Sequence, residues 1–156
     1  MAEVILLLQA ASTLAMVGLI WFVQIVHYPL FGAVGHEQFA EYERLHQART
    51  TWVVAPIMLL EAFTTVLLVL LRPLGVSAGA AVFGLVLLII VWASTFFWQV
   101  PTHAELGFGF SAAAHRSLVQ SNWIRTAAWT MRGLLVCWMI GDVFLRNSSM
   151  IIAQLP

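Results

Sequence analysis

The stretch from Val4 to Leu30 reads VILLLQAASTLAMVGLIWFVQIVHYPL and contains no Asp, Glu or Arg. Such a run is long enough to cross the ~30 Å hydrocarbon core of a bilayer, which takes about 20 residues in a helix. A helix is required there because lipid offers no hydrogen-bond partners to an open backbone. We therefore predict a first transmembrane helix at 4–30. The Met-Ala-Glu start lacks a basic segment, which favours an uncleaved helix over a signal peptide.

Three further apolar runs have the same property, at about 52–71, 76–100 and 121–145. None of them shows the alternation of apolar and polar residues that is typical of a membrane β-barrel. We find no internal repeat and no linker. The sequence therefore predicts an all-α fold, an integral membrane four-helix bundle, in which residues 1–156 form a single transmembrane domain.

The composition excludes several classes of protein. Hydrophobic residues make up 62% of the chain and charged residues 9%, with a mean hydropathy of +0.93 and a formal net charge of 0. This is too little charge for a water-soluble domain or a disordered segment, and there is no basic excess for nucleic acid. The lipid bilayer is the expected partner. The single Cys137 excludes a disulfide framework.

The connections predict on which face each loop lies. Four spans in series place the first and third loops on one face, here called side A, and both termini on the other. On side A, the segment from His36 to His46 is predicted to be helical and to lead into the second span. Ser111 can cap the helix that leads into the fourth span, and Pro101 is expected to end the third. Two helices should therefore project beyond the bilayer on side A.

Several surface residues indicate how the bundle sits in the membrane. Tyr28 and three tryptophans near side A fit interfacial aromatic anchors, namely Trp52, Trp98 and Trp123. Arginines are more frequent on side A, which favours a cytoplasmic side A. We expect a multi-pass protein of the cell membrane, which in a bacterium is the inner membrane. A homo-oligomer or a larger membrane complex would suit such a small bundle.

All the histidines fall near side A, although they come from three spans and both loops: His27, His36, His46, His103 and His115. His27 lies about a turn inside the first span, where an ionisable ring is costly unless it has a partner. Closure of the bundle could bring His27, His46 and His103 towards one pocket. We expect His36 and His115 to be interfacial and without a role.

Imidazole is the commonest metal ligand, and it binds when neutral. Glu43 and His46 form a Glu-x-x-His pair, the spacing that di-iron carboxylate bundles use twice and this chain has once. Taken alone, this pair is more simply interpreted as part of a solvated helix surface. The predicted metal ligands are accordingly His27, Glu43, His46 and His103.

The fourth span carries a polar stripe at helical spacing, composed of Asn122, Arg125, Trp129 and Arg132. This stripe must face the bundle interior. Arg132 lies about 15 Å into its helix, at a depth comparable to that of Glu61 in the second span. We predict a buried ion pair between them, because either charge alone in hydrocarbon costs several kcal/mol. A purely structural role for the pair is preferred over a catalytic one.

Two partial resemblances bear on function. The segments 101–106 (PTHAEL) and 122–132 (NWIRTAAWTMR) resemble the third-loop and fourth-helix pattern of the anthrone-oxygenase-like family. That pattern has Asn where His103 stands and a His in the fourth helix, which this sequence lacks. The first span from Trp21 to Leu30 resembles the small four-span protoporphyrinogen oxidases, which use a first-helix His for haem. Those proteins also have a Lys in the third helix, whereas this chain contains no Lys. The resemblances imply a redox or oxygenase-type membrane protein.

These observations predict a membrane oxidoreductase or oxygenase-like protein that binds a metal or haem. The predicted catalytic residues are His27, His103 and Arg125, where the Arg125 guanidinium orients an apolar or aromatic small molecule that enters from lipid. An anionic substrate, a haem propionate or a lipid head group are other partners for Arg125. The candidate cofactor-binding residues are Gln24, Asn122, Arg125 and Trp129.

Three alternatives remain open from the sequence. A cofactor-free enzyme could use the same histidines as acid or base. A non-enzymatic subunit or scaffold of a larger complex could use the histidine face for docking. A small transporter would place Glu61 and Arg132 in a proton or ion path.

Overall fold

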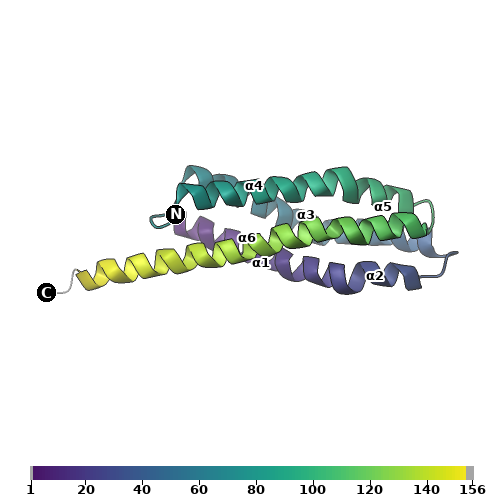
Figure 1. The fold of residues 1–156 in the computed structure, drawn as a ribbon, viewed down its shortest axis with the longest axis horizontal. Coiled ribbons are helices and arrows are strands. Elements are labelled where there is room, and N and C mark those ends of the chain that lie inside the picture. The colour runs from purple at the N-terminus through teal and green to yellow at the C-terminus, as the bar shows by residue number, and fades with distance from the viewer. Residues whose placement is uncertain (1, 154–156) are drawn as a thin grey trace.

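The computed structural model describes residues 2–153, and within that range it contains helices and no strands. Four helical rods run alternately in opposite directions (Figure 1). Each is long and apolar enough to cross a membrane: Ala2–Ala33, Phe39–Leu70, Ala78–Leu106 and Ala112–Arg146. The predicted all-α four-helix bundle is confirmed.

Two of the rods are built from several helical segments. The first contains α1 (Ala2–Phe22), the π-helical turn η1 (Val23–His27), α2 (Tyr28–Leu30) and the 3-10 turn η2 (Phe31–Ala33). The third contains α4 (Ala78–Ser94), the π-helical turn η3 (Thr95–Gln99) and α5 (Val100–Leu106). The second and fourth rods are the unbroken helices α3 (Phe39–Leu70) and α6 (Ala112–Ala153).

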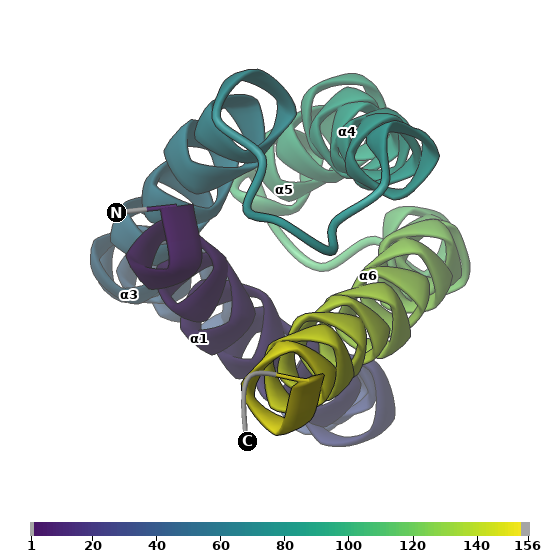
Figure 2. The same ribbon diagram turned by 90° about the vertical axis from the view of Figure 1, so that its left-hand side faces the viewer.

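The rods form a ring when viewed along the bundle (Figure 2). In this ring α1 lies between α3 and α6, and α4 lies opposite α1. The packing around the ring is uneven, because α3 contacts α4 less extensively than it contacts α1. The side between α3 and the third rod is therefore the most open part of the bundle.

The side A ends of α3 and α6 continue without a break into the spans (Figure 1). The Ser111 hydroxyl caps α6 as predicted, accepting a hydrogen bond of 3.2 Å from the Ala114 backbone N–H. The predicted helical start at His36 was wrong. Residues 36–38 form a turn, and α3 begins at Phe39.

Pro101 does not end the third rod, contrary to our expectation. The π-helical turn η3 precedes it, so Pro101 lies in the first turn of α5, where a missing backbone N–H costs little. The first rod repeats this arrangement, with η1 before Pro29 at the start of α2. Both rods thereby continue past a proline and carry His27 and His103 towards the side A end.

The predicted ion pair between Glu61 and Arg132 is present and fully buried. The Arg132 Nε donates to Glu61 Oε1 at 2.9 Å, and the Thr13 hydroxyl donates to the same oxygen at 2.8 Å. The other carboxylate oxygen, Oε2, accepts from the Trp129 indole N–H at 2.9 Å. Both oxygens of the buried carboxylate are therefore satisfied.

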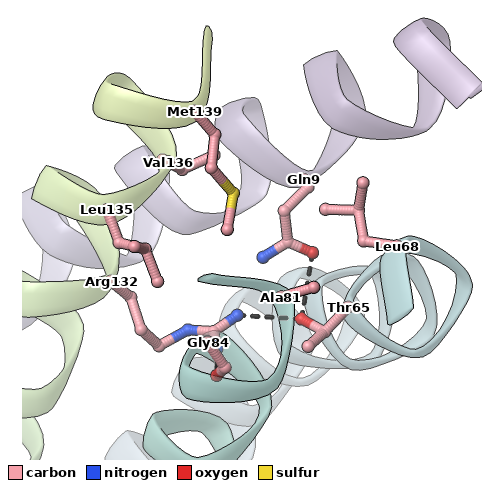
Figure 3. A pocket seen from close by; sticks show the side chains of 9 residues that line it. All are labelled: Gln9, Thr65, Leu68, Ala81, Gly84, Arg132, Leu135, Val136 and Met139. Carbon is pink, nitrogen blue, oxygen red and sulfur yellow. Dashed lines mark hydrogen bonds between the residues drawn. The ribbon is translucent and has the colours of Figure 1, made fainter. Parts of the chain in front are cut away.

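Arg132 also connects α6 to α3 and α4 (Figure 3). Its Nη2 donates to the Thr65 hydroxyl at 2.9 Å on α3, and its Nη1 donates to the Gly84 carbonyl on α4. The Thr65 hydroxyl in turn donates to the Gln9 amide oxygen on α1 at 3.0 Å. All four rods are thus tied to one guanidinium, beside a cavity of only about 20 Å³.

Replacing Arg132 with Met should lower the free energy of unfolding by about 3–5 kcal/mol, because the Glu61 carboxylate is then buried without a counter-charge. Denaturant unfolding in detergent micelles measures this loss. The double variant Glu61→Met with Arg132→Met should be more stable than Arg132→Met alone. A strictly additive loss in the double variant would contradict the proposed coupling of the two charges.

Candidate functional site

The side A end of the bundle contains a cluster of imidazoles around the buried ring of Phe31. The centroid of that ring lies 5.1 Å from His46, 5.3 Å from His27 and 6.3 Å from His103. These three histidines come from three different rods, as the alternation of the spans predicted. His115 stacks on the same ring at 6.4 Å, and its Nε2 lies 2.7 Å from the Tyr28 carbonyl oxygen. It therefore helps to hold α2 against α6.

His103 is held at both of its ring nitrogens. Its Nδ1 lies 2.6 Å from Glu43 Oε1, and its Nε2 lies 2.9 Å from the Tyr28 hydroxyl oxygen. The Gln47 side-chain amide joins them by donating to Glu43 Oε1 at 3.0 Å and to the His103 carbonyl at 3.1 Å. Glu43 is 0% exposed. The simpler interpretation of Glu43 as part of a solvated surface was therefore wrong.

His46 and His27 contact each other directly. The Nε2 of His27 lies 2.9 Å from the Nδ1 of His46, and the Thr50 hydroxyl lies 3.1 Å from the same Nδ1. Since Nδ1 of His46 is occupied twice, its Nε2 is the nitrogen that remains available to a ligand. His27 was predicted as a direct metal ligand, but the structure places it behind His46.

Glu43, His46 and His103 lie close enough together to hold a metal ion. Each offers one ligand atom, and these atoms lie within 4.8 Å of one another. The Oε2 of Glu43 is buried and has no hydrogen-bond partner, and within residues 2–153 no arginine pairs with this carboxylate. A buried carboxylate oxygen without a partner is costly. A divalent cation bound by the carboxylate, His46 and Nδ1 of His103 would satisfy it, in place of the hydrogen bond between His103 Nδ1 and Glu43 Oε1.

A cavity of about 350 Å³ lies next to this cluster, between α3 and the third rod. Its polar lining includes His46, His103, Tyr28 and Arg125, while most of the rest is apolar. At its rim are Phe96 and Val100, which are 56% and 53% exposed on the outer surface of the bundle. The cavity therefore opens sideways, towards the region that lipid occupies.

The polar stripe of α6 faces inwards as predicted, but its members do different things. The Asn122 amide donates to the Gln24 amide oxygen at 2.9 Å, and the Gln24 amide donates to the Val119 carbonyl at 3.2 Å. Neither Gln24 nor Asn122 lines the cavity, so these two hold η1 against α6. Trp129 binds Glu61. Of the predicted cofactor-binding residues, Arg125 alone is part of the cavity wall.

The analysis of the sequence missed Tyr28 and Phe31 as members of the site. Tyr28 was interpreted as an interfacial anchor, yet it is 4% exposed, whereas Trp52, Trp98 and Trp123 are all exposed as anchors should be. The sequence feature that could have indicated a role for Tyr28 is its position directly between His27 and a proline. A helix distortion there turns the ring inwards, which hydropathy cannot show.

The chain matches no protein-family model, no curated protein and no solved structure.

Metal binding tests the cluster. After incubation with Fe²⁺, Mn²⁺ or Zn²⁺ and desalting, we expect about one ion per chain by elemental analysis, because the set offers three protein ligands. Glu43→Gln should abolish stoichiometric retention, and His27→Gln should weaken it by roughly 10–100-fold through loss of the contact behind His46. The exposed His36, changed to Gln, is the matched control. Unchanged metal retention in Glu43→Gln would contradict the site.

Proposed function

We propose that this protein is a membrane-embedded, metal-dependent oxidoreductase of the oxygenase type that acts on an apolar substrate. One observation carries the proposal: the buried Glu43 oxygen has no partner and lies beside two imidazoles that can ligate. Two histidines and one carboxylate with open coordination positions are the ligand set of non-haem Fe(II) oxygenases. Glu43, His46 and His103 would hold the metal.

The surroundings of these ligands support a metal site. A metal-ligating histidine usually donates its second ring N–H to a neighbouring acceptor, which fixes the orientation of the ring. The Nδ1 of His46 has His27 and Thr50 as neighbours, and the Nε2 of His103 has the Tyr28 hydroxyl. Each predicted ligand is thus oriented by a residue from another turn or another rod.

A small metal ion fits this site better than haem does. A histidine that binds haem iron needs open space for the flat haem next to its ligating nitrogen. His27 and His46 are instead in direct hydrogen-bond contact, and the Phe31 ring packs in a T-shaped arrangement against both of them. The resemblance to haem-binding four-span oxidases therefore contributes less to the proposal than the resemblance to the anthrone-oxygenase-like family.

The cavity supports an apolar substrate. Its walls are mostly apolar, and its rim lies on the lipid-facing surface between α3 and the third rod. A substrate dissolved in the bilayer could enter sideways without crossing water. In this proposal the metal supplies the redox chemistry with dioxygen as oxidant, while the protein excludes bulk water and orients the substrate.

One observation favours a second candidate, a cofactor-free enzyme. Glu43, His103 and Tyr28 form a continuous line in which the carboxylate contacts Nδ1 of the imidazole and Nε2 contacts the phenol. A carboxylate in this position holds the imidazole in one orientation and one tautomer, with the other nitrogen directed at its partner. Acid–base catalysis through His103 would then need no metal.

Nitric oxide distinguishes the two candidates, because it binds open positions on Fe(II) as a spectroscopic surrogate for dioxygen. Protein loaded with Fe²⁺ without oxygen should give the electron paramagnetic resonance signal of an iron–nitrosyl complex. His46→Gln should abolish this signal, and His36→Gln should keep it. If the protein retains no iron but turns over a lipophilic substrate in a manner that His103→Gln abolishes, the cofactor-free enzyme is favoured. A metal-free, inactive protein that copurifies with partners would favour the non-enzymatic subunit.

A further inference from the structure

We propose that Arg125 is the binding site for the head group of a lipid-soluble carboxylic acid, bound as its carboxylate. This names the substrate class for the cavity described above, and in that respect it rests on the proposed function. Arg125 is a buried cation without a carboxylate partner among residues 2–153.

Arg125 is only 7% exposed. Its guanidinium carbon lies 5.1 Å from the centroid of the Trp129 ring, and the guanidinium faces the Tyr28 hydroxyl. Its Nε is buried without a hydrogen-bond partner, and no carboxylate within residues 2–153 forms an ion pair with it. A guanidinium held in a largely apolar setting therefore lacks a counter-ion.

The other buried arginine of α6 makes the contrast clear. Arg132 lies about two turns further along the same face and has Glu61, Thr65 and the Gly84 carbonyl as partners. Figure 3 shows two of these partners around it. The bundle can thus satisfy a buried guanidinium completely where its role is internal. At Arg125 no carboxylate within residues 2–153 fills this role, which leaves the guanidinium open to a ligand.

The position of Arg125 indicates where that partner comes from. Arg125 lines the same lipid-facing cavity as His46 and His103, and Tyr28 contacts both Arg125 and His103. A carboxylate on Arg125 would place the carbons next to it beside the histidine cluster. The remaining apolar part of the molecule would follow the cavity towards its exposed rim at Phe96 and Val100.

The chemistry of the guanidinium selects a carboxylate over a neutral head group. Its planar fork can donate two parallel N–H···O bonds to one carboxylate, and charge-assisted bonds of this kind are roughly twice as strong as neutral ones. An alcohol or an ester of the same chain length would occupy the apolar cavity but leave the buried charge uncompensated.

Native mass spectrometry of metal-free protein in a non-ionic detergent tests the proposal without involving the metal. Wild-type protein should retain one dodecanoate per chain and should bind dodecanol and methyl dodecanoate at least tenfold more weakly. Arg125→Gln should reduce dodecanoate binding to the level of dodecanol. Arg125→Lys should bind dodecanoate with intermediate affinity, because it keeps the charge and loses the fork. Arg116→Gln, an exposed position on the same helix, is the matched control and should bind like wild type.

Melting temperatures distinguish a loss of binding from a folding defect. Because Arg125 has no carboxylate partner within residues 2–153, the melting temperature of ligand-free Arg125→Gln should be no lower than that of wild type, whereas dodecanoate should raise the melting temperature of wild type alone. Equal binding of dodecanoate and dodecanol by wild type would overturn the proposal. Retention of phosphatidylglycerol in preference to dodecanoate would also overturn it, by identifying a phospholipid head group as the occupant. Since no metal is present, loss of the metal site in other experiments would leave this result unaffected.

Discussion

The ion pair between Glu61 and Arg132 is the interaction on which the bundle depends. In a bilayer, apolar side chains give little preference for one helix arrangement over another, because lipid tails are as apolar as the side chains themselves. Polar contacts therefore define the register. This pair, with Thr13, Thr65, Trp129 and the Gly84 carbonyl, contacts all four rods. It fixes how far each rod slides along its neighbours, and the side A end is positioned as a result.

The second buried carboxylate has the opposite character. Glu61 has a partner at each oxygen, whereas Glu43 has one oxygen without any partner. The same contrast separates Arg132 from Arg125. The pair with complete hydrogen bonding lies towards the interior between the rods. Arg125 instead lines the open cavity on side A, and Glu43 contacts His103, which lines the same cavity. A structural contact requires a hydrogen-bond or ionic partner for every buried polar atom. A binding site leaves some of these atoms without a partner until its ligand binds. This separation supports a structural role for Glu61 over a role in an ion path.

Much of the architecture could be predicted because membrane insertion leaves few choices. The length of the apolar segments defined the membrane spans. Because successive spans run in opposite directions, His27, His46 and His103 fall at the same end of the bundle. The spacing along the fourth span showed that Arg125 and Arg132 face inwards. The errors arose where local geometry departs from a regular helix. The two π-helical turns keep the rods helical past their prolines, so Pro101 did not act as a helix end.

The sequence by itself determined that the chain forms four membrane-spanning helices with histidines near one face. These conclusions need only the hydropathy of each segment and the helical repeat of its residues. The tertiary structure alone decided which of those residues meet. It separated His46 and His103, which face the Glu43 carboxylate, from His27, which lies behind them, and it turned Gln24 and Asn122 towards each other. The physical reason is that helix rotation and π-helical distortion set side-chain direction within a few ångströms, and both are products of packing between rods that are distant in sequence.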